Sequence, residues 1–375
     1  MATPPARILQ SRQWFLAPPS TRSGQVDALD GLRGLAVLVV LGSHLSNAGW
    51  LPRPGLAGSG KLGVYLFFVL SAFLLTRILL RRLPAGWSDA RLWVDYGLRR
   101  ILRIWPLYLV VLLASWVFTL AGAEGWHYRM ETPALLRHLL LVEGRSVLWS
   151  IPVEFKYYLW LPAVALGLAL SRSRRWSWWA EAAVVGLGIA AAAWAWPPAE
   201  TAANDVRLGP YLALFLCGAY AARLDERLSG AAQRPWAWRA VAACAIAAVA
   251  AQFPAAWALL SGSAFDPQRT HTWFLAAGLG WSALLLAVLH GVPTIRAVFA
   301  SAPMRWIGVV SFSAYLWHMP VLDGLRHVGM PPSPLGAPLA LLAVAAVSGL
   351  SYLAFERPWR DLRVSWPAHR SAAAP

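Results

Sequence analysis

The sequence predicts an all-α integral membrane protein, a bundle of about ten transmembrane helices with both termini in the cytosol. Composition is the first observation behind this prediction. Of the 375 residues, 58% are hydrophobic and only 13% are charged, and the mean hydropathy is +0.51. Soluble domains carry about 25% charged residues. The second observation is that long apolar windows recur along nearly the whole chain, and the third is an uneven distribution of arginine between them.

About ten apolar windows hold enough residues to cross roughly 30 Å of hydrocarbon. The polar connections between them are short, so no second soluble domain fits between the helices. We therefore expect a cytosolic tail over residues 1–26, a transmembrane domain over residues 27–358 and a second cytosolic tail over residues 359–375. The predicted helices lie near residues 29–48, 62–81, 101–121, 147–170, 177–196, 208–223, 238–260, 272–291, 306–328 and 336–355.

Basic residues gather on one side of this predicted bundle. With the N-terminus inside, the cytosolic segments hold about three times as many Lys and Arg residues as the outer segments, as the positive-inside rule expects. This asymmetry accounts for most of the formal net charge of +16, so the charge does not indicate a nucleic-acid partner. Residues 1–26 contain no apolar core and are not expected to be a signal peptide. Cys217 and Cys244 lie in apolar windows, which argues against a disulfide or a cysteine metal site.

The first predicted helix carries two residues that a lipid-facing helix would not. Arg33 lies near its start and His44 near its end. At 100° per residue both fall on one face, roughly 16 Å apart along the axis, and such residues usually face a cavity or a bundle interior. The alternative is that Arg33 extends to the interface and His44 is an ordinary core histidine. Asp30, three residues before Arg33, could pair with it.

Three further residues place polar groups in the second and third predicted helices. Ser71 lies among aromatic residues, where the ordinary interpretation is helix packing. Arg100 and Arg103 share one face at the cytosolic end of the third helix. Two guanidinium groups there could bind a phosphate, and the alternative is ordinary positive-inside charge.

Titratable residues at membrane depth form the last group. Glu154 lies between prolines and aromatic residues, next to Lys156, and is a functional candidate with a structural ion pair as the alternative. His318 lies in an otherwise apolar window, where a single histidine is more often a core residue. His44, Glu154 and His318 together have the composition of a proton-transfer site. We interpret Glu356, in the turn that ends the last helix, as a structural anchor.

Six stretches in this order resemble the acyltransferase-3 family of bacterial membrane O-acyltransferases. They are LDGLRGLAVLVVLGSH, FFVLSAFLL, RRILRIWPLY, LWSIPVEFKYYLWLP, YLWHMP and FERP, and they cover the chain from residue 29 to residue 358. The resemblance implies a multi-pass protein of the bacterial cytoplasmic membrane that takes an acyl group from cytosolic acyl-CoA, with acetyl-CoA as the expected donor. The implied acceptor is a hydroxyl of a carbohydrate, a lipid-linked glycan or a glycosylated metabolite.

The family pattern pairs an arginine with a later histidine, and Arg33 and His44 occupy these positions. Its two-arginine motif falls on Arg100 and Arg103, and its mid-chain glutamate on Glu154. The sequence departs from the pattern at two places that could alter packing near the acceptor. Ala72 stands where a glycine is usual after Ser71, and Phe155-Lys156 stand where an acidic residue and a glutamine are common.

These positions predict direct acyl transfer. Arg33, Arg100 and Arg103 would bind the CoA phosphates at the cytosolic side. His44 would be the general base for the attacking hydroxyl, supported by Glu154 or by His318, and the sequence does not decide which. The less favoured alternative is an acyl-enzyme on Ser71 or a tyrosine, for which Tyr108 and Tyr158 are candidates, with packing as their other interpretation. No metal is expected, because no metal-ligand cluster appears.

A proton-coupled transporter is the alternative from another class, with His44, Glu154 and His318 as its relay. Transporters often contain two related halves, and no such internal repeat is visible here. We therefore favour the O-acyltransferase. Few residues follow the last predicted helix, so we expect the membrane domain to reach its acceptor itself or to pass the acyl group to a separate protein.

Overall fold

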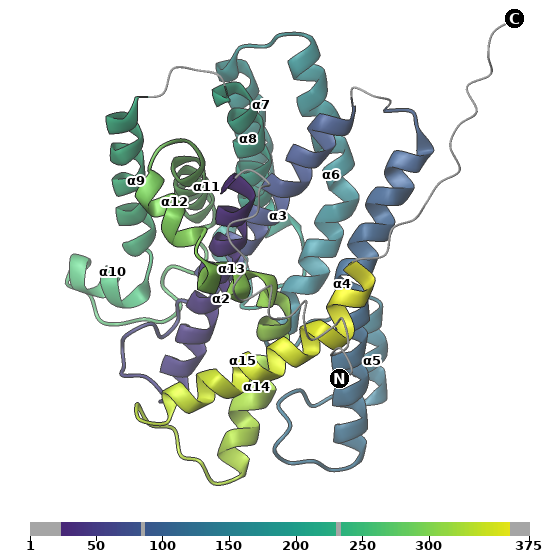
Figure 1. Cartoon of the computed structure of the whole chain (residues 1–375), viewed down its shortest axis with the longest axis vertical. Coiled ribbons are helices and arrows are strands. Elements are labelled where there is room, and N and C mark those ends of the chain that lie inside the picture. The colour runs from purple at the N-terminus through teal and green to yellow at the C-terminus, as the bar shows by residue number, and fades with distance from the viewer. Residues whose placement is uncertain (1–23, 84–86, 230–233, 361–375) are drawn as a thin grey trace, which may run out of the picture.

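The computed structural model describes residues 24–83, 87–229 and 234–360, and all regular secondary structure within these ranges is helical (Figure 1). The all-α prediction is confirmed. The predicted tails fall mostly on residues 1–23 and 361–375, which lie outside the described residues. The described parts of the two predicted tails, residues 24–26 and 359–360, are helical. α2 (Gly24–Asn47) begins before residue 27, and α16 (Arg357–Arg360) includes residues 359 and 360.

Six helical units in the described residues are long and apolar enough to cross a membrane. The first three are α2, α3 (Gly60–Arg82) and α4 (Ala90–Leu120). The fourth is α6 (Ser150–Ser173) with the 3-10 turn η2 (Ser146–Trp149) that leads into it, and the fifth is α7 (Trp178–Ala195). The sixth combines α15 (Ala337–Ser351), the π-helical turn η5 (Tyr352–Glu356) and α16.

Two bent helix pairs raise the number of candidate spans in the described residues to at most eight, so the predicted count of ten is not confirmed. α9 (Pro235–Ala250) and α10 (Pro254–Ser261) meet at 92°, and α11 (Phe274–His290) and α12 (Pro293–Phe299) meet at 104°. Both breaks precede a proline, which cannot donate to the preceding turn. α8 (Leu212–Leu228) and α14 (Ser311–His327) have 17 residues each, fewer than the roughly 20 that a straight span needs.

α2 and α3 form the centre of the bundle. α8, α6 and α11 pack against α3, whereas α14 and the short α13 (Ala302–Val309) pack against α2. The two central helices approach closely, because a Cβ atom at Gly63 would lie only 2.4 Å from the carbonyl oxygen of Ala36. Small residues allow this kind of backbone contact between membrane helices. The main hydrophobic core surrounds this pair and includes Phe68, Phe73 and Leu32.

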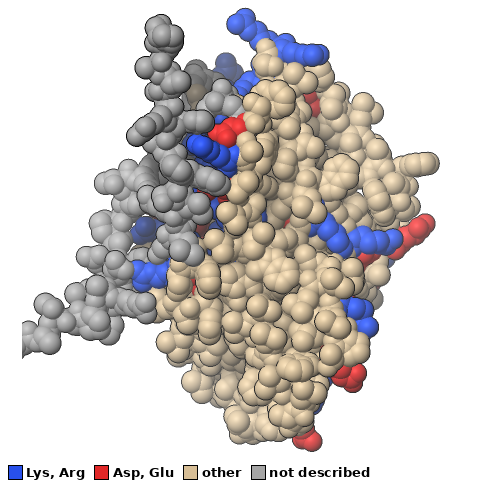
Figure 2. Space-filling view, turned by 90° about the vertical axis from the view of Figure 1, so that its right-hand side faces the viewer, with Lys and Arg blue, Asp and Glu red and all other residues tan. Residues whose placement is uncertain are grey.

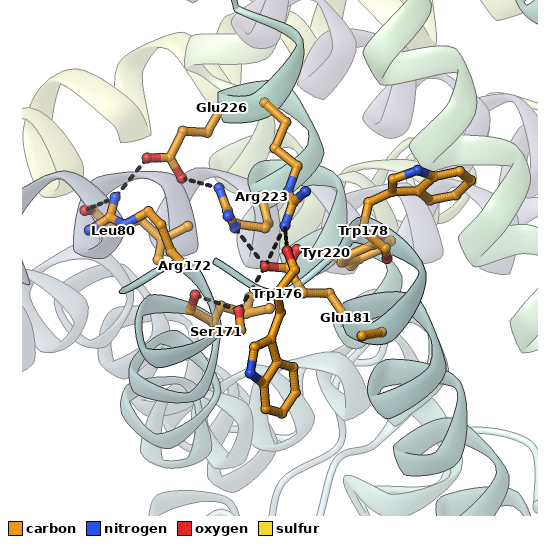
Figure 3. A network of polar contacts seen from close by, with 12 residues as sticks. Leu80, Ser171, Arg172, Trp176, Trp178, Glu181, Tyr220, Arg223 and Glu226 are labelled. Carbon is orange, nitrogen blue, oxygen red and sulfur yellow. Dashed lines mark hydrogen bonds and ion pairs between the residues drawn. The ribbon is translucent and has the colours of Figure 1, made fainter. Parts of the chain in front are cut away.

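A buried ion network joins α6, α7 and α8 at one end of the bundle (Figure 3). The side chain of Glu181 on α7 is fully buried and lies 3.2 Å from Arg223 and 2.9 Å from Arg227, both on α8. Ser171 of α6 also donates to Glu181, at 2.8 Å. Glu226 links Arg223 to Arg172 of α6, at 3.0 and 2.6 Å. Several arginines of the predicted cytosolic side are therefore structural.

The surface suits a lipid environment. Figure 2 shows a face on which charged side chains lie mainly at the upper end, at the upper left and along the right-hand edge, while the broad area between them is uncharged. Large apolar side chains are exposed on helices that could span the membrane, such as Leu159 on α6 (81%) and Trp194 on α7 (85%). Exposed apolar side chains at this density are stable in hydrocarbon. Composition, helix length and surface together support a multi-pass membrane protein.

The remaining elements lie in the connections. α5 (Thr132–Leu139) follows the loop after α4, and the 3-10 turns η3 (Pro198–Glu200) and η4 (Gly209–Tyr211) lie between α7 and α8.

Candidate active site

The first cavity, which we call the arginine cavity, lies between α2, α3, α4, α6 and α14. It has a volume of about 810 Å³. All three residues predicted to bind a cofactor, Arg33, Arg100 and Arg103, line it together. They come from two helices whose motifs are far apart in the sequence, so the structure brings this predicted group to one place. The other lining residues are mostly apolar.

The three arginines differ in their partners. Arg103 forms an ion pair with Glu356 at 3.1 Å, and the other oxygen of Glu356 accepts from the backbone N–H of Ser313, also at 3.1 Å. Glu356 is thus an anchor between α4, η5 and α14, as the sequence predicts. Arg33 has no hydrogen bond or ion pair with any described residue, and the suggested pair with Asp30 does not form. Asp27, which precedes Asp30 by about one helical turn, lies 3.6 Å from Arg305.

The guanidinium of Arg100 lies over an aromatic ring and forms no ion pair with a carboxylate of the described residues. Its guanidinium lies 5.9 Å from the centre of the Tyr158 ring, and its buried Nε atom has no hydrogen-bond partner in the described residues. Arg33 and Arg100 are therefore the two guanidinium groups of this cavity whose charge no carboxylate neutralises at ion-pair distance. A cavity with uncompensated cations favours an anionic ligand.

Glu154 lies in the arginine cavity with the two predicted hydroxyl candidates. The Ser71 hydroxyl donates to Glu154 Oε1 at 2.7 Å, and the Tyr158 hydroxyl donates to the same oxygen. Lys156 does not pair with Glu154, because its Nζ donates to the carbonyl of Val206 at 2.7 Å. The structural ion pair considered for Glu154 is therefore absent. Its partners are two hydroxyl groups.

Tyr108 does not reach this cavity. Its ring is fully buried, its hydroxyl donates to the carbonyl of His138 at 3.4 Å, and its edge packs against Trp105. It joins α4 to α5, so the structure supports the packing interpretation of Tyr108. Tyr158 and Ser71 do line the cavity.

A second cavity contains His44, and we call it the histidine cavity. It has a volume of about 950 Å³ and polar lining groups from several connections. Asn47 and Lys61 come from the two ends of the α2–α3 connection, and Asn204 and Gln268 come from the loops before α8 and α11. Amide and ammonium groups that converge on one space can hold a ligand rich in hydroxyls.

The two cavities share the side chains of Val64 and Tyr315 as a common wall. The Tyr315 hydroxyl donates to the carbonyl of Val147 at 2.5 Å and accepts from Ser150 at 2.9 Å. These bonds fix the ring between the two spaces. Sequence reasoning missed Tyr315, although it lies three residues before His318 and therefore on the same face of α14.

The structure pairs His44 with His318 and not with Glu154. The rings of His44 and His318 have their centres 5.0 Å apart. His318 is fully buried and donates from Nδ1 to the carbonyl of Ala314 at 3.1 Å, which leaves Nε2 without a partner in the described residues. Of the two supports considered for His44, His318 is the neighbour, whereas Glu154 faces the arginine cavity.

The comparisons with known proteins identify the family of this chain. A family model described as an acyltransferase domain matches residues 26–353. The chain belongs to the acyltransferase-3 family. This membership supports an acyltransferase and does not favour the proton-coupled transporter.

Several relatives of this chain are named as O-acetyltransferases. The chain is 26% identical over 357 residues to peptidoglycan O-acetyltransferase OatA of Listeria monocytogenes, a match that covers 89% of this chain and 56% of the relative. It is 25% identical over 398 residues to putative peptidoglycan O-acetyltransferase YrhL of Bacillus subtilis, covering 89% of this chain and 55% of the relative. The chain thus spans about half the length of these relatives. No solved structure matches it significantly.

Proposed function

We propose that this acyltransferase-3 protein moves an acyl group, with acetyl as the expected one, from acyl-CoA to a hydroxyl of a carbohydrate acceptor. The observation that carries the proposal is the pair of cavities that meet at Tyr315 and Val64. One contains uncompensated arginines, as an anionic donor requires. The other contains a histidine and hydroxyl-binding side chains, as an alcohol acceptor requires.

The arginine cavity is the proposed donor site. CoA carries several phosphates, and Arg33 and Arg100 offer guanidinium groups that have no carboxylate of the described residues at ion-pair distance. The positive-inside rule assigns this side to the cytosol, where acyl-CoA is found. The rise from Arg33 to His44 along α2, roughly 16 Å, suits an extended pantetheine arm between the phosphates and the thioester. Glu154 would orient the Ser71 and Tyr158 hydroxyls along this path.

His44 is the proposed general base. An alcohol is a poor nucleophile at neutral pH, and a histidine that removes its proton during the attack on the thioester lowers the barrier. The proton passes to His44 and then to the sulfur, so CoA leaves as the thiol. His318, whose Nε2 is unpartnered and whose ring lies beside His44, is the proposed support for the His44 ring.

The acceptor belongs to the histidine cavity. The relatives named as peptidoglycan O-acetyltransferases make a peptidoglycan sugar the first acceptor to test. Asn47, Asn204 and Gln268 can donate to and accept from sugar hydroxyls. A lipid-linked glycan and a glycosylated metabolite offer the same chemistry.

The test uses the full chain in proteoliposomes with labelled acetyl-CoA and soluble peptidoglycan fragments. We expect His44→Ala to lower acetyl transfer at least about 100-fold, because general-base catalysis contributes roughly this factor. His327→Ala is the matched control, since His327 is exposed at the end of α14 and lines neither cavity. Undiminished transfer by His44→Ala would refute His44 as the base. If the wild-type protein releases no CoA with a peptidoglycan fragment, a lipid-linked glycan or a glycosylated metabolite, the assignment of acyl-CoA as the donor is refuted.

A further inference from the structure

A serine, a histidine and an aspartate outside the proposed acyl-CoA site have the geometry of a hydrolase triad. His127 Nδ1 lies 2.6 Å from Oδ2 of Asp323, and His127 Nε2 lies 2.9 Å from Oγ of Ser146. The aspartate contacts one ring nitrogen and the serine the other, which is the arrangement by which such triads are recognised on unrelated folds. The three residues come from the α4–α5 loop, α14 and the start of η2.

Ser146 faces a space that can hold a substrate. It lines the histidine cavity together with His44, whereas His127 and Asp323 lie behind it. The side chains of His127 and Asp323 are 17% and 31% exposed. The serine is therefore the member of the triad that a ligand in this cavity would meet first. An acylated sugar held beside His44 would lie next to the Ser146 hydroxyl.

The backbone at Ser146 is unusual for a serine. Its φ angle is +50°, in the left-handed region that a residue other than glycine rarely adopts. Nucleophilic serines of other hydrolases also occupy sharp turns that open a helix, and the turn exposes Oγ. Ser146 opens η2, which continues into α6.

Contacts on both sides hold this turn in place. A Cβ atom at Gly144 would lie 2.3 Å from Cα of Trp149, so the loop rests directly on the backbone of η2. Glu143 lies 2.5 Å from Arg137 and 2.6 Å from Arg145. Burial opposes ionisation of Glu143, but the hydrogen bonds from the two arginines hold its pKa below the usual value. The turn is thus fixed by side chains that are charged at neutral pH.

We propose that Ser146, His127 and Asp323 form a second acyl-transfer centre, a serine esterase site for acyl esters of hydroxylated ligands in the histidine cavity. It goes beyond the proposed transfer from acyl-CoA and needs no CoA. Asp323 is the positioning residue, which holds the His127 ring, and Ser146 and His127 contact the substrate. Arg326 lies 3.4 Å from the other oxygen of Asp323 and leaves Oδ2 to His127.

The chemistry balances with water as the co-reactant. Ser146 Oγ attacks the ester carbonyl while its proton passes to His127 Nε2. The bond from the carbonyl carbon to the alkoxy oxygen then breaks, and His127 protonates the departing alcohol. Water attacks the acyl-serine, gives its proton to His127 and releases the carboxylic acid, after which Ser146 regains its proton. A second sugar hydroxyl in place of water would move the acyl group between sugars.

The experiment uses the purified full chain in detergent micelles, without acyl-CoA. A fluorophosphonate probe is added, and mass spectrometry locates the adduct. We expect the phosphonyl group on Ser146, together with a burst of nitrophenolate from p-nitrophenyl acetate. Ser146→Ala and His127→Gln should each lower both signals at least about 100-fold. Ser263→Ala is the control, because Ser263 is an exposed serine paired with another serine and not with a histidine.

The role of Asp323 has its own readout. Asp323→Asn should lower kcat for p-nitrophenyl acetate roughly 100-fold and leave KM nearly unchanged, and Asp323→Glu should restore part of kcat. An adduct on a different serine, or no adduct on wild type, would overturn the esterase site even where Ser146→Ala does not fold. Because the assay contains no acyl-CoA, this result is independent of whether His44 catalyses the CoA-dependent transfer.

Discussion

At the scale of single residues, the partner of each charged group separates structural residues from candidate ligand-binding residues. Arg103 belongs to an ion pair with Glu356, whereas Arg33 and Arg100 face the same cavity without a carboxylate at ion-pair distance. Arg99, next in sequence to Arg100, pairs with Asp95 at 2.8 Å on the surface. Adjacent arginines of one motif thus have different surroundings, and we expect different effects when each is replaced.

We predict that Arg100→Gln raises KM for acetyl-CoA roughly tenfold to 100-fold, because a charged hydrogen bond contributes about 1.5–3 kcal/mol. The value of kcat should change little, since Arg100 would bind phosphates far from the thioester. Initial rates at several acetyl-CoA concentrations test this. Arg99→Gln is the matched control and should keep KM unchanged. Equal KM values for the two variants would remove Arg100 from the donor site.

At the scale of elements, buried polar side chains determine how the helices are fixed to one another. Glu181 holds α7 to two arginines of α8 and to Ser171 of α6. When helices of a membrane protein separate, lipid contacts their apolar faces as favourably as the neighbouring helix did. Specific polar contacts and close packing therefore contribute more to helix association than hydrophobic burial does.

We predict that Glu181→Gln destabilises the bundle by roughly 3 kcal/mol, because removal of this buried carboxylate takes away the ion-pair partner of Arg227 and leaves Arg223 with Glu226 alone. The apparent melting temperature in detergent should fall clearly. Asp95→Asn is the control, since Asp95 pairs with two arginines that are 48% and 47% exposed, and exposed pairs contribute about 0–1 kcal/mol. A melting temperature for Glu181→Gln equal to that of Asp95→Asn would contradict the structural role of this network.

At the scale of the whole molecule, the bundle contains two cavities that meet at one tyrosine. Tyr315 is fixed by Ser150 and by the carbonyl of Val147, and it contacts Phe67 at 6.3 Å between ring centres. In the proposed transfer, this wall separates the arginine cavity, where the donor binds, from the water of the histidine cavity, where the acceptor binds. Exclusion of water protects a reactive acyl donor from hydrolysis.

We predict that Tyr315→Ala increases CoA release without acceptor several-fold, because it opens the wall between the cavities. Tyr315→Phe keeps the ring, so its ratio of CoA release without acceptor to CoA release with acceptor should remain close to that of wild type. Thiol release measured with and without acceptor gives the ratio for each variant. A Tyr315→Ala protein whose CoA release still requires acceptor would show that Tyr315 does not separate donor from water.

The sequence alone determined the helical class and the family, and it predicts the arginines and histidines of the proposed site. These depend on local information: the length of apolar windows, the spacing along one helix and short motifs. The span count depends on more than hydropathy, because hydropathy records apolar length and does not record a 92° or 104° bend.

Only the tertiary structure decided which side chains meet. It placed Glu154 with Ser71 and Tyr158, His318 beside His44, and Tyr315 between the cavities. It also brought His127 to Asp323, 196 residues away along the chain. Such contacts depend on how helices cross and on the exact course of the loops, which a single sequence does not encode in any local pattern. The physical reason is that side chains bond and react only over a few ångströms, whereas the residues of one site are separated along the chain by whole helices.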